Sequence, residues 1–358
     1  GPVGALAAMA GLCLERAVAL TRLREAPPGS PLGIEPAEDA LQAEIEGLRA
    51  AKEEAESERD SLRAEAQDLR QRFKQMMAGD KLIVAPGVYD GLTATLATRT
   101  GFDAIYMTGA GTAAQKGYPD YGLLTMTEMV ANAETIATAT DMPVVADADT
   151  GYGTELNVTS TVQEFERAGV AAIHLEDQGF PKKCGHLDDK EIIPLEDYVA
   201  KIRAAAAARK DRNFQIIART DSRAVISFEE AIRRGKAAVE AGADIVFIEA
   251  PQTMDELKAI PKEIKAPCLF NYVEGGKTPD CDMKTVADMG FRLAILPGVL
   301  LRQVIMTCEN VLNGIKETGE PPAPTSGLGV RQIFERVGSA KWDALRTEFA
   351  SGTKQPAE

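Results

Sequence analysis

From residue 80 onward, the chain alternates short runs of β-branched and apolar residues with alanine-rich segments whose apolar positions recur at helical spacing. Eight of the apolar runs predict strands, at Leu82–Ala85, Ala104–Met107, Pro143–Asp147, Ala171–Leu175, Gln215–Arg219, Asp244–Glu249, Pro267–Asn271 and Arg292–Leu296. Helical patterns separate these strands, for example at Leu124–Thr140, Glu155–Ala168, Leu195–Arg209, Phe228–Ala241 and Met254–Ile264. Alternating strands and helices over roughly 230 residues predict an α/β fold, the (β/α)8 or TIM barrel.

A weak internal repeat supports the barrel. Each copy begins with a glycine that ends a helix and continues into a buried strand, at Gly101, Gly169, Gly242 and Gly290. The structural alternative is a doubly wound open sheet. No GxGxxG motif follows the first strand, so dinucleotide binding loses its main support in the sequence.

The first 70 residues have a different texture. Residues 41–76 follow a coiled-coil heptad, but Lys52 and Arg59 occupy seam positions and predict weak self-association. A shorter apolar helix at residues 6–24 and a proline-rich linker at residues 27–31 precede it. We therefore expect a helical arm at 1–70 and a barrel domain with a C-terminal helical extension at 71–358. The arm reads as a solvated helix without chemistry, as a surface for a partner helix, or as a rigid helix fused to the barrel.

Composition narrows the class of protein. Hydrophobic residues make up 45% of the chain and charged residues 26%, which is typical of a folded globular protein. The net charge of −14 and the lack of a basic run argue against a nucleic-acid partner. No apolar stretch approaches the roughly 18–20 residues that span a bilayer, so we expect no membrane partner. The five cysteines form no CxxC pair, which favours a reducing, cytoplasmic location over a disulfide framework or a zinc ribbon.

Polar residues gather where the predicted strands end. In barrel enzymes the reactive groups lie just past the carboxyl ends of the strands, so these positions are the first candidates for chemistry. The residues that stand there are Tyr106, Thr108, Gly109, Ala110, Asp147, Asp149, Glu176, Arg219, Glu249 and Asn271.

Three carboxylates in this set predict a metal site. Asp147, Asp149 and Glu176 come from adjacent strands and supply the hard oxygen ligands that Mg²⁺ prefers, with Mn²⁺ as a possible substitute. Without a cation they would repel one another. Zinc fits less well, because the chain has two histidines, His174 and His186, and no HExxH spacing.

A second dense segment runs from Lys182 to His186, in a long loop after the fourth predicted strand. Lysines and a histidine beside Cys184 predict a lowered thiol pKa and a proton donor or nucleophile. Gly185 is expected to let the loop close. The alternative is a basic surface loop with an incidental cysteine. Cys268, in a strand, and Cys308, in a helical stretch, are expected to be core residues.

Residues 72–320 resemble the isocitrate lyase and phosphoenolpyruvate mutase superfamily. The matching segments occur in family order, at Ala85–Asp90, Asp147–Gly153, His174–Gln178, Lys182–His186, Ala218–Asp221 and Asn271–Pro279. The resemblance implies a Mg²⁺-dependent enzyme for small α-keto or α-hydroxy dicarboxylates. It also implies a homotetramer with C-terminal helices exchanged between subunits, for which the helical pattern Val330–Phe349 is available.

Within this superfamily, the Lys182–His186 segment resembles the lyase branch and favours carbon–carbon cleavage. The segment Asn271–Pro279 looks more like the dimethylmalate lyase and petal-death-protein group than like methylisocitrate lyases, which tend to carry phenylalanine at the position of Gly275. We therefore expect retro-aldol cleavage of a 2-hydroxydicarboxylate, a substituted malate or citrate-like acid. An oxaloacetate hydrolase on the same site, and a fusion scaffold whose arm is the functional part, stay open.

The resemblance also suggests roles for the residues at the strand ends. Mg²⁺ would be held by Asp147 and, directly or through waters, by Asp149 and Glu176. Cys184 would protonate the departing acid, and Arg219 would neutralise developing negative charge. Lys182 and His186 complete the catalytic loop, while the base stays open among Tyr106, Arg219 and a water on the metal. Substrate contacts are expected from Thr108, Gly109, Ala110, Gly185, Glu249 and Asn271.

Overall fold

The computed structural model describes residues 35–323 and 327–351 of the chain. The helix expected at residues 6–24 and the linker expected at residues 27–31 lie outside the described residues. The chain divides into two compact units, residues 1–65 and residues 66–358.

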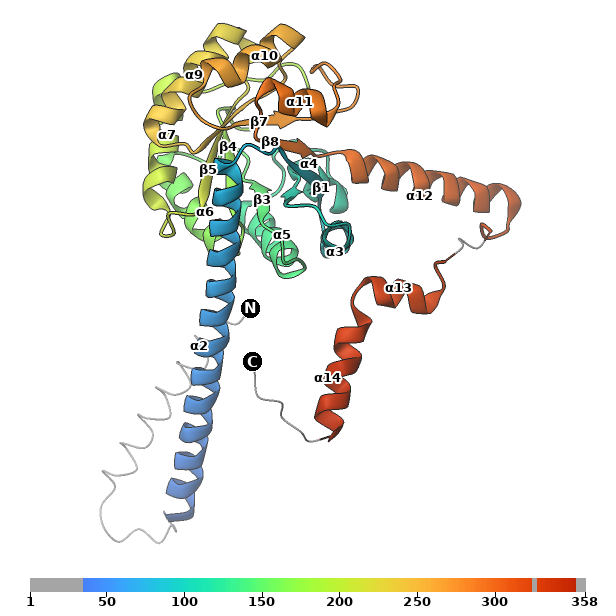
Figure 1. Cartoon of the computed structure of the whole chain (residues 1–358). Coiled ribbons are helices and arrows are strands. Elements are labelled where there is room, and N and C mark those ends of the chain that lie inside the picture. The colour runs from blue at the N-terminus through green and yellow to red at the C-terminus, as the bar shows by residue number, and fades with distance from the viewer. Residues whose placement is uncertain (1–34, 324–326, 352–358) are drawn as a thin grey trace. The chain divides into compact units, whose positions relative to one another are not determined.

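Eight parallel strands close into a barrel in sequence order, as the apolar runs predicted (Figure 1). The strands are β1 (Ile83–Val88), β2 (Ile105–Met107), β3 (Val144–Asp147), β4 (Ala172–Glu176), β5 (Gln215–Thr220), β6 (Ile245–Ile248), β7 (Cys268–Asn271) and β8 (Leu293–Leu296). The first and last strands pair directly, with Ile83 opposite Leu293 and Ala85 opposite Ile295. This closure rules out the doubly wound open sheet.

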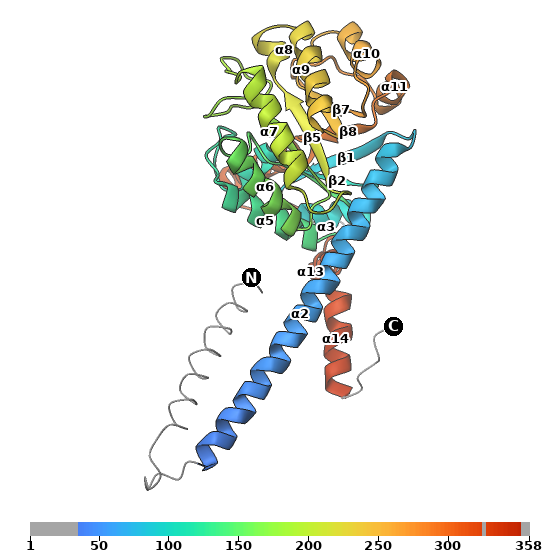
Figure 2. The same cartoon turned by 90° about the vertical axis from the view of Figure 1, so that its left-hand side faces the viewer.

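Helices follow the strands and form the outer layer of the barrel. Several of these helices face the viewer in Figure 2. Those of the barrel are α3 (Gly91–Arg99), α4 (Gly109–Gln115), α5 (Met126–Thr138), α6 (Glu155–Arg167), α7 (Leu195–Ala208), α8 (Ser222–Val225), α9 (Phe228–Ala241), α10 (Met254–Glu263) and α11 (Met283–Met289). The repeat glycines end helices as expected. Gly242 and Gly290 cap α9 and α11 with φ of 108° and 103°, which is the left-handed region where glycine has no steric penalty.

Apolar side chains fill the barrel and the layer between strands and helices. The interior of the barrel holds residues such as Val145, Ile217, Phe247 and Leu269, all buried. Barrel interiors are packed with branched and aromatic side chains in this way, so the barrel is a solid core and the chemistry is confined to its rims.

The long helix α2 (Glu35–Ala78) ends inside the barrel unit. Phe73 and Met77 are buried in the same apolar cluster as the strand residues. The Arg70 guanidinium donates to the carbonyl oxygen of Val170 at 3.0 Å and to that of Glu166. In the part of the helix before residue 66, which belongs to the first unit, Leu62 is exposed. Of the described helices, none is long and apolar enough to cross a membrane.

Phe73→Ala should destabilise the barrel by about 3–5 kcal/mol, because it removes a fully buried aromatic side chain and leaves a cavity. Urea unfolding measured on the full chain tests this, with the exposed neighbour Gln71→Ala as the matched control. A loss below about 1 kcal/mol would mean that the end of α2 does not belong to the barrel core.

Among the described residues, three helices follow β8: α12 (Val299–Thr318), α13 (Val330–Arg336) and α14 (Ser339–Ser351). The expected continuous pattern Val330–Phe349 is interrupted, because Gly338 adopts a φ of 84° between α13 and α14. Cys308 is exposed on α12, so its expected place in a core is wrong for this chain taken alone. Large apolar side chains on these helices are also exposed, among them Met306, Leu312, Phe334, Trp342 and Phe349.

Candidate active site

The polar residues at the strand ends meet at one rim of the barrel. Asp147, Glu176 and Asn271 are the last residues of β3, β4 and β7, and Arg219 lies near the end of β5. Glu249 follows β6 directly. Because all eight strands are parallel, these ends share the same face, as the barrel geometry requires.

Asp147 is held by its own backbone segment and by a side chain of the neighbouring strand β2. Its Oδ1 accepts the backbone N–H of Asp149 at 2.9 Å, and its Oδ2 accepts the Tyr106 hydroxyl at 3.4 Å. The Tyr106 hydroxyl also lies 2.8 Å from Nε2 of His174. A Cβ on Gly109 would stand 2.3 Å from Asp147 Oδ2, so α4 can begin this close to the carboxylate only with glycine.

Charges around Asp147 keep it ionised. Burial opposes its ionisation, yet His174, Lys182 and Arg219 together lower its pKa to about 2. Burial lowers the pKa of His174 to about 4, so the ring is neutral at pH 7 and the two basic side chains supply the positive charge. Burial also raises the pKa of Tyr106 well above its usual value, which makes it a hydrogen-bond donor rather than a base.

Lys182 reaches from the loop after β4 to the rim. Its Nζ lies 2.6 Å from Asp149 Oδ1 and 2.5 Å from Asp120 Oδ1, and the side chain is buried. Burial alone would lower its pKa, but the surrounding carboxylates raise it well above the usual value. Burial raises the pKa of Asp149 to about 6, because it outweighs the attraction of Lys182. Asp149 itself has a φ of 48°, a strained conformation that is common at functional sites.

Arg219 pairs with the last residue of β4 and with Asp221, which directly follows β5. Its Nη1 lies 3.2 Å from Glu176 Oε2, and its Nε donates to Asp221 Oδ2 at 3.0 Å. The guanidinium carbon stands 5.2 Å from the centre of the Phe247 ring, which covers one face of the cation. Burial raises the pKa of Glu176 well above its usual value even with Arg219 beside it.

The loop of residues 177–194 closes over this rim. A Cβ on Gly185 would stand 2.4 Å from Glu249 Oε1 and 2.5 Å from Arg219 Nη2. His186 Nε2 lies 3.1 Å from Glu249 Oε1, and the Asn271 amide donates to the same carboxylate at 3.1 and 3.2 Å. Gly185 was expected to give the loop freedom. Its role in the structure is different, because the missing side chain lets the loop lie directly on two buried charged groups.

The environment of Cys184 corrects the predicted thiol pKa. Burial raises the pKa of Cys184 instead of lowering it, and the thiol is protonated at pH 7. The nearby basic residues act elsewhere, because Lys182 is paired with Asp149 and His186 with Glu249. A protonated, partly buried thiol is suited to donating a proton and poorly suited to nucleophilic attack.

The predicted metal ligands lie on adjacent strands, yet they do not form an assembled cluster. Among the described residues, no group of three or more His, Cys, Asp or Glu side chains is placed to hold a metal ion. Lys182 and Arg219 pair with Asp149 and Glu176 instead. The donor set still fits a hard divalent cation. Within the described chain, Oε1 of the buried Glu176 has no hydrogen-bond partner, and carboxylate oxygens are the ligands that Mg²⁺ prefers.

Thr108, Gly109 and Ala110 lie where β2 passes into α4. The Thr108 hydroxyl accepts the backbone N–H of Gly111 at 3.3 Å as the N-cap of this helix. Because the hydroxyl oxygen accepts here, the hydroxyl can still donate its proton to another group.

Sequence reasoning missed two residues of this arrangement. Asp120 pairs with Lys182 from the loop between α4 and α5, and Lys190 is buried against Asp221. Both stand in segments that read as polar turns, and no signal in the sequence pairs them with groups far along the chain.

Gly185→Ala should displace the loop, because the new methyl group overlaps two ion-paired side chains that cannot retreat into the core. We expect alkylation of Cys184 by iodoacetamide to become about tenfold faster through local opening. Gly179→Ala is the matched control on the same loop, where the nearest atom to a new Cβ lies 3.8 Å away. Equal alkylation rates in wild type and Gly185→Ala would contradict the closed loop.

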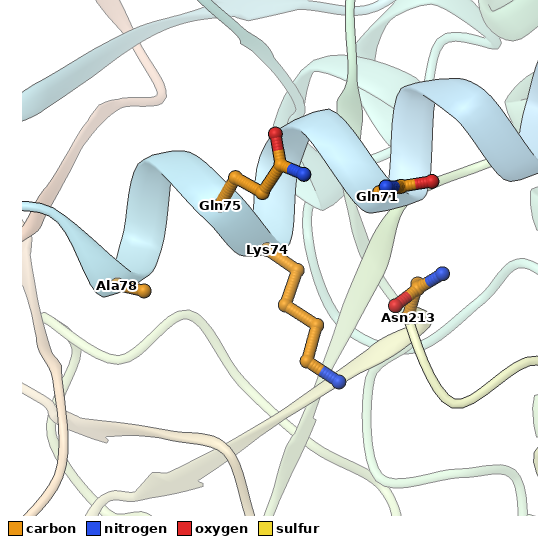
Figure 3. Close-up of a pocket in the computed structure, with 5 residues that line it drawn as sticks. All are labelled: Gln71, Lys74, Gln75, Ala78 and Asn213. Atoms are coloured by element: carbon orange, nitrogen blue, oxygen red, sulfur yellow. The ribbon is translucent and has the colours of Figure 1, made fainter.

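A surface hollow elsewhere carries no comparable chemistry. It has a volume of about 470 Å³ and is lined by Gln71, Lys74, Gln75, Ala78 and Asn213 (Figure 3). These residues precede β1 and β5, so the hollow lies at the amino ends of the strands, and Lys74 is its one titratable lining residue. In barrel enzymes that rim contributes to stability.

The barrel matches a known family of enzymes. The family model described as phosphoenolpyruvate phosphomutase matches residues 73–316. A 2,3-dimethylmalate lyase from Eubacterium barkeri is 49% identical over 227 residues, which are 63% of this chain and 78% of that protein. A 2-methylisocitrate lyase from Aeropyrum pernix is 44% identical over 279 residues, which are 78% of this chain and 90% of that protein.

Solved structures are similar to most of this chain. An oxaloacetate acetylhydrolase in complex with the inhibitor 3,3-difluorooxalacetate has a TM-score of 0.74 and 36% identity, over 80% of this chain and 97% of that chain. A phosphonopyruvate hydrolase in complex with oxalate and Mg²⁺ has a TM-score of 0.71 and 30% identity, over 78% of this chain and 99% of that chain.

Proposed function

The chain belongs to the phosphoenolpyruvate mutase and isocitrate lyase superfamily, and from this premise we propose that it is a Mg²⁺-dependent carbon–carbon lyase. Its substrate would be a 2-hydroxydicarboxylate, split into a 2-oxo acid and a second carboxylic acid. The observation that carries the proposal is the position of the loop that holds Cys184, because the neighbouring Gly185 lies directly against Glu249 and Arg219 at the rim of the barrel.

Retro-aldol cleavage assigns a task to each charged group. A water at the rim would accept the proton of the substrate hydroxyl, because burial raises the pKa of Tyr106 and the surrounding carboxylates raise that of Arg219, so that both stay protonated. The bond between C2 and C3 then breaks, and its electron pair moves onto the departing acid as an enediolate. Cys184 donates a proton to C3 of this fragment and completes the second product. Arg219 would offset the negative charge that develops on the fragment, and the Tyr106 hydroxyl and Lys182 would donate hydrogen bonds beside it.

Substrate carboxylates need donors as well. We assign the Thr108 hydroxyl and the backbone N–H groups of Gly109 and Ala110 to one carboxylate, since they lie at the start of α4, where Gly109 packs against Asp147. Gly185, Glu249 and Asn271 would border the other end of the substrate, and His186 holds Glu249 in place.

The metal would be bound by Asp147 and, directly or through waters, by Asp149 and Glu176. When bound, Mg²⁺ supplies a Lewis acid that polarises the hydroxyl and the adjacent carboxylate of the substrate. Mn²⁺ suits the same hard oxygen donors. The related phosphonopyruvate hydrolase in complex with oxalate and Mg²⁺ supports this proposal.

An oxaloacetate hydrolase is the second candidate, because the similarity to the oxaloacetate acetylhydrolase structure covers 97% of that protein's chain. The two activities are separated by a substrate panel of 2,3-dimethylmalate, 2-methylisocitrate, isocitrate and oxaloacetate, each with Mg²⁺. We expect turnover of a hydroxy acid. Turnover of oxaloacetate alone would favour the hydrolase and contradict the lyase.

We further propose a homotetramer in which the C-terminal helices are exchanged between subunits. The support is the run of exposed apolar side chains on α12, α13 and α14, such as Leu312, Phe334 and Trp342, since isolated chains rarely leave such surfaces uncovered.

Removing residues 1–65 should leave an active oligomer with the same number of subunits, because the charged seam positions Lys52 and Arg59 weaken helix association in the arm. The cut spares Arg70, which is buried in the barrel unit. Light scattering and an activity assay on the shortened chain test this. If the shortened chain is monomeric, the arm is the part that assembles the oligomer. If it is inactive, the arm is needed for function.

A further inference from the structure

Lys190 is a buried lysine on the loop that carries Cys184. Its side chain is 1% exposed, and its Nζ lies 2.8 Å from Asp221 Oδ1. The same ammonium donates to the backbone carbonyl of Gly185, the residue that follows Cys184. Burying an ammonium group costs free energy unless its N–H donors find acceptors. The side chain of Lys190 is therefore strongly held in the geometry that satisfies both acceptors.

Asp221 is itself fixed by the barrel. Both of its carboxylate oxygens accept from Arg219, at 3.0 and 3.3 Å. Its backbone N–H donates to Asp177 Oδ1 at 2.8 Å, and Asp177 in turn accepts from the Thr220 hydroxyl at 2.6 Å and from Arg234 at 2.9 Å. The anchor for Lys190 therefore belongs to the end of β5 and not to the loop.

Two other side-chain ties of the loop end on groups that the proposed chemistry would engage. Lys182 is paired with Asp149, a proposed metal ligand, and His186 with Glu249, a proposed substrate neighbour. Lys190 differs, because its partners are the carboxylate of Asp221 and the backbone carbonyl of Gly185, and we assign neither of these two groups to the metal or the substrate. Its tie can persist while metal and substrate bind.

We propose that Lys190 is a positioning residue for proton transfer. Its ammonium ties the carbonyl of Gly185 to Asp221 and so sets where the thiol of Cys184 lies over the barrel rim. The inference rests on the proposed role of Cys184 as proton donor. Displacement of a reacting group by about 1 Å can cost roughly 100-fold in rate, so a backbone tie one residue away has a large effect.

Lys190→Met tests the tie. Methionine keeps most of the apolar stem and removes the ammonium, and Arg219 still pairs with Asp221, so no carboxylate is left buried without a cation. Lys183→Met is the matched control on the same loop, because Lys183 donates from a more exposed position to the carbonyl of Asp189. Lys190→Arg retains the charge and should recover part of the lost function.

Two measurements on the full chain separate positioning from stability. Iodoacetamide labelling, read by peptide mass spectrometry, compares Cys184 with Cys268, which is buried in β7 and reports unfolding of the barrel. In Lys190→Met we expect Cys184 to label about tenfold faster while Cys268 stays at the wild-type rate. We also expect kcat to fall roughly 100-fold while KM changes less than about threefold.

Each other outcome contradicts the proposal in a distinct way. Cys268 that labels faster together with Cys184, or a variant that does not fold, makes Lys190 a stabilising residue only. If Cys184 labels at the wild-type rate, Lys190 does not hold the loop in place. If Cys184 labels faster but kcat is unchanged, Lys190 holds the loop without affecting catalysis. If the wild type cleaves no hydroxy acid, the proposed function fails, while the labelling comparison still decides whether Lys190 holds the loop.

Discussion

Cys184→Ser should lower turnover by roughly 10²–10⁴-fold, the usual contribution of a general acid. A serine hydroxyl is a much weaker acid than a thiol and cannot deliver the proton at a useful rate. The exchange removes little volume from a partly buried position, so the barrel should unfold at the wild-type urea concentration. Steady-state kinetics together with urea unfolding separate the two effects.

Cys281→Ser is the control for this variant, because Cys281 is also partly buried and lies outside the loop that covers the rim. It should retain the wild-type rate. If Cys184→Ser also turns over at that rate, the thiol is incidental, and the assignment to carbon–carbon cleavage loses its chemical basis.

Removing divalent metal should abolish turnover, and adding Mg²⁺ or Mn²⁺ should restore it. The three carboxylates Asp147, Asp149 and Glu176 lie at one rim. Lys182 and Arg219 compensate part of their charge, but these side chains cannot chelate a substrate hydroxyl as a metal ion does. Assays after exhaustive dialysis against a chelator, with metal content measured by atomic emission, provide the test.

Folding should survive this treatment, since the ion pairs to Lys182 and Arg219 already compensate two of the carboxylates. Circular dichroism before and after dialysis is the control. Full activity in a sample shown to be free of metal would contradict the proposed role of the carboxylates.

The fold was predictable because buried parallel strands read as short apolar runs, and glycines such as Gly242 and Gly290 mark where helices end. The strand ends then located the rim residues, since parallel strands place their carboxyl ends together. The structure shows Asp147, Glu176 and Asn271 at those ends, as the pattern predicted.

Other features depend on contacts that a linear reading does not reveal. The thiol of Cys184 has lysines beside it in sequence, but in space Lys182 turns to Asp120 and Asp149, and burial decides the thiol pKa. Cys308 lies on a helix whose apolar pattern predicts burial, yet in one chain this face stays exposed. Partners in space, within or between chains, supply the missing information.

The boundary of the arm shows the same limit. Heptad spacing runs without interruption into Leu69 and Met76, so the sequence pattern does not distinguish an exposed seam from a buried face. The structure separates them by contact, because Arg70 and Phe73 are buried while Leu62 is exposed.

The most direct test of the proposed lyase is product analysis in D₂O with Mg²⁺ and the hydroxy acid that the enzyme turns over fastest. We predict equal amounts of a 2-oxo acid and of a second carboxylic acid that carries one carbon-bound deuterium, the mark of an enediolate protonated after cleavage. Formation of oxalate and acetate from oxaloacetate, with no 2-oxo acid released from any hydroxy acid, would contradict the account.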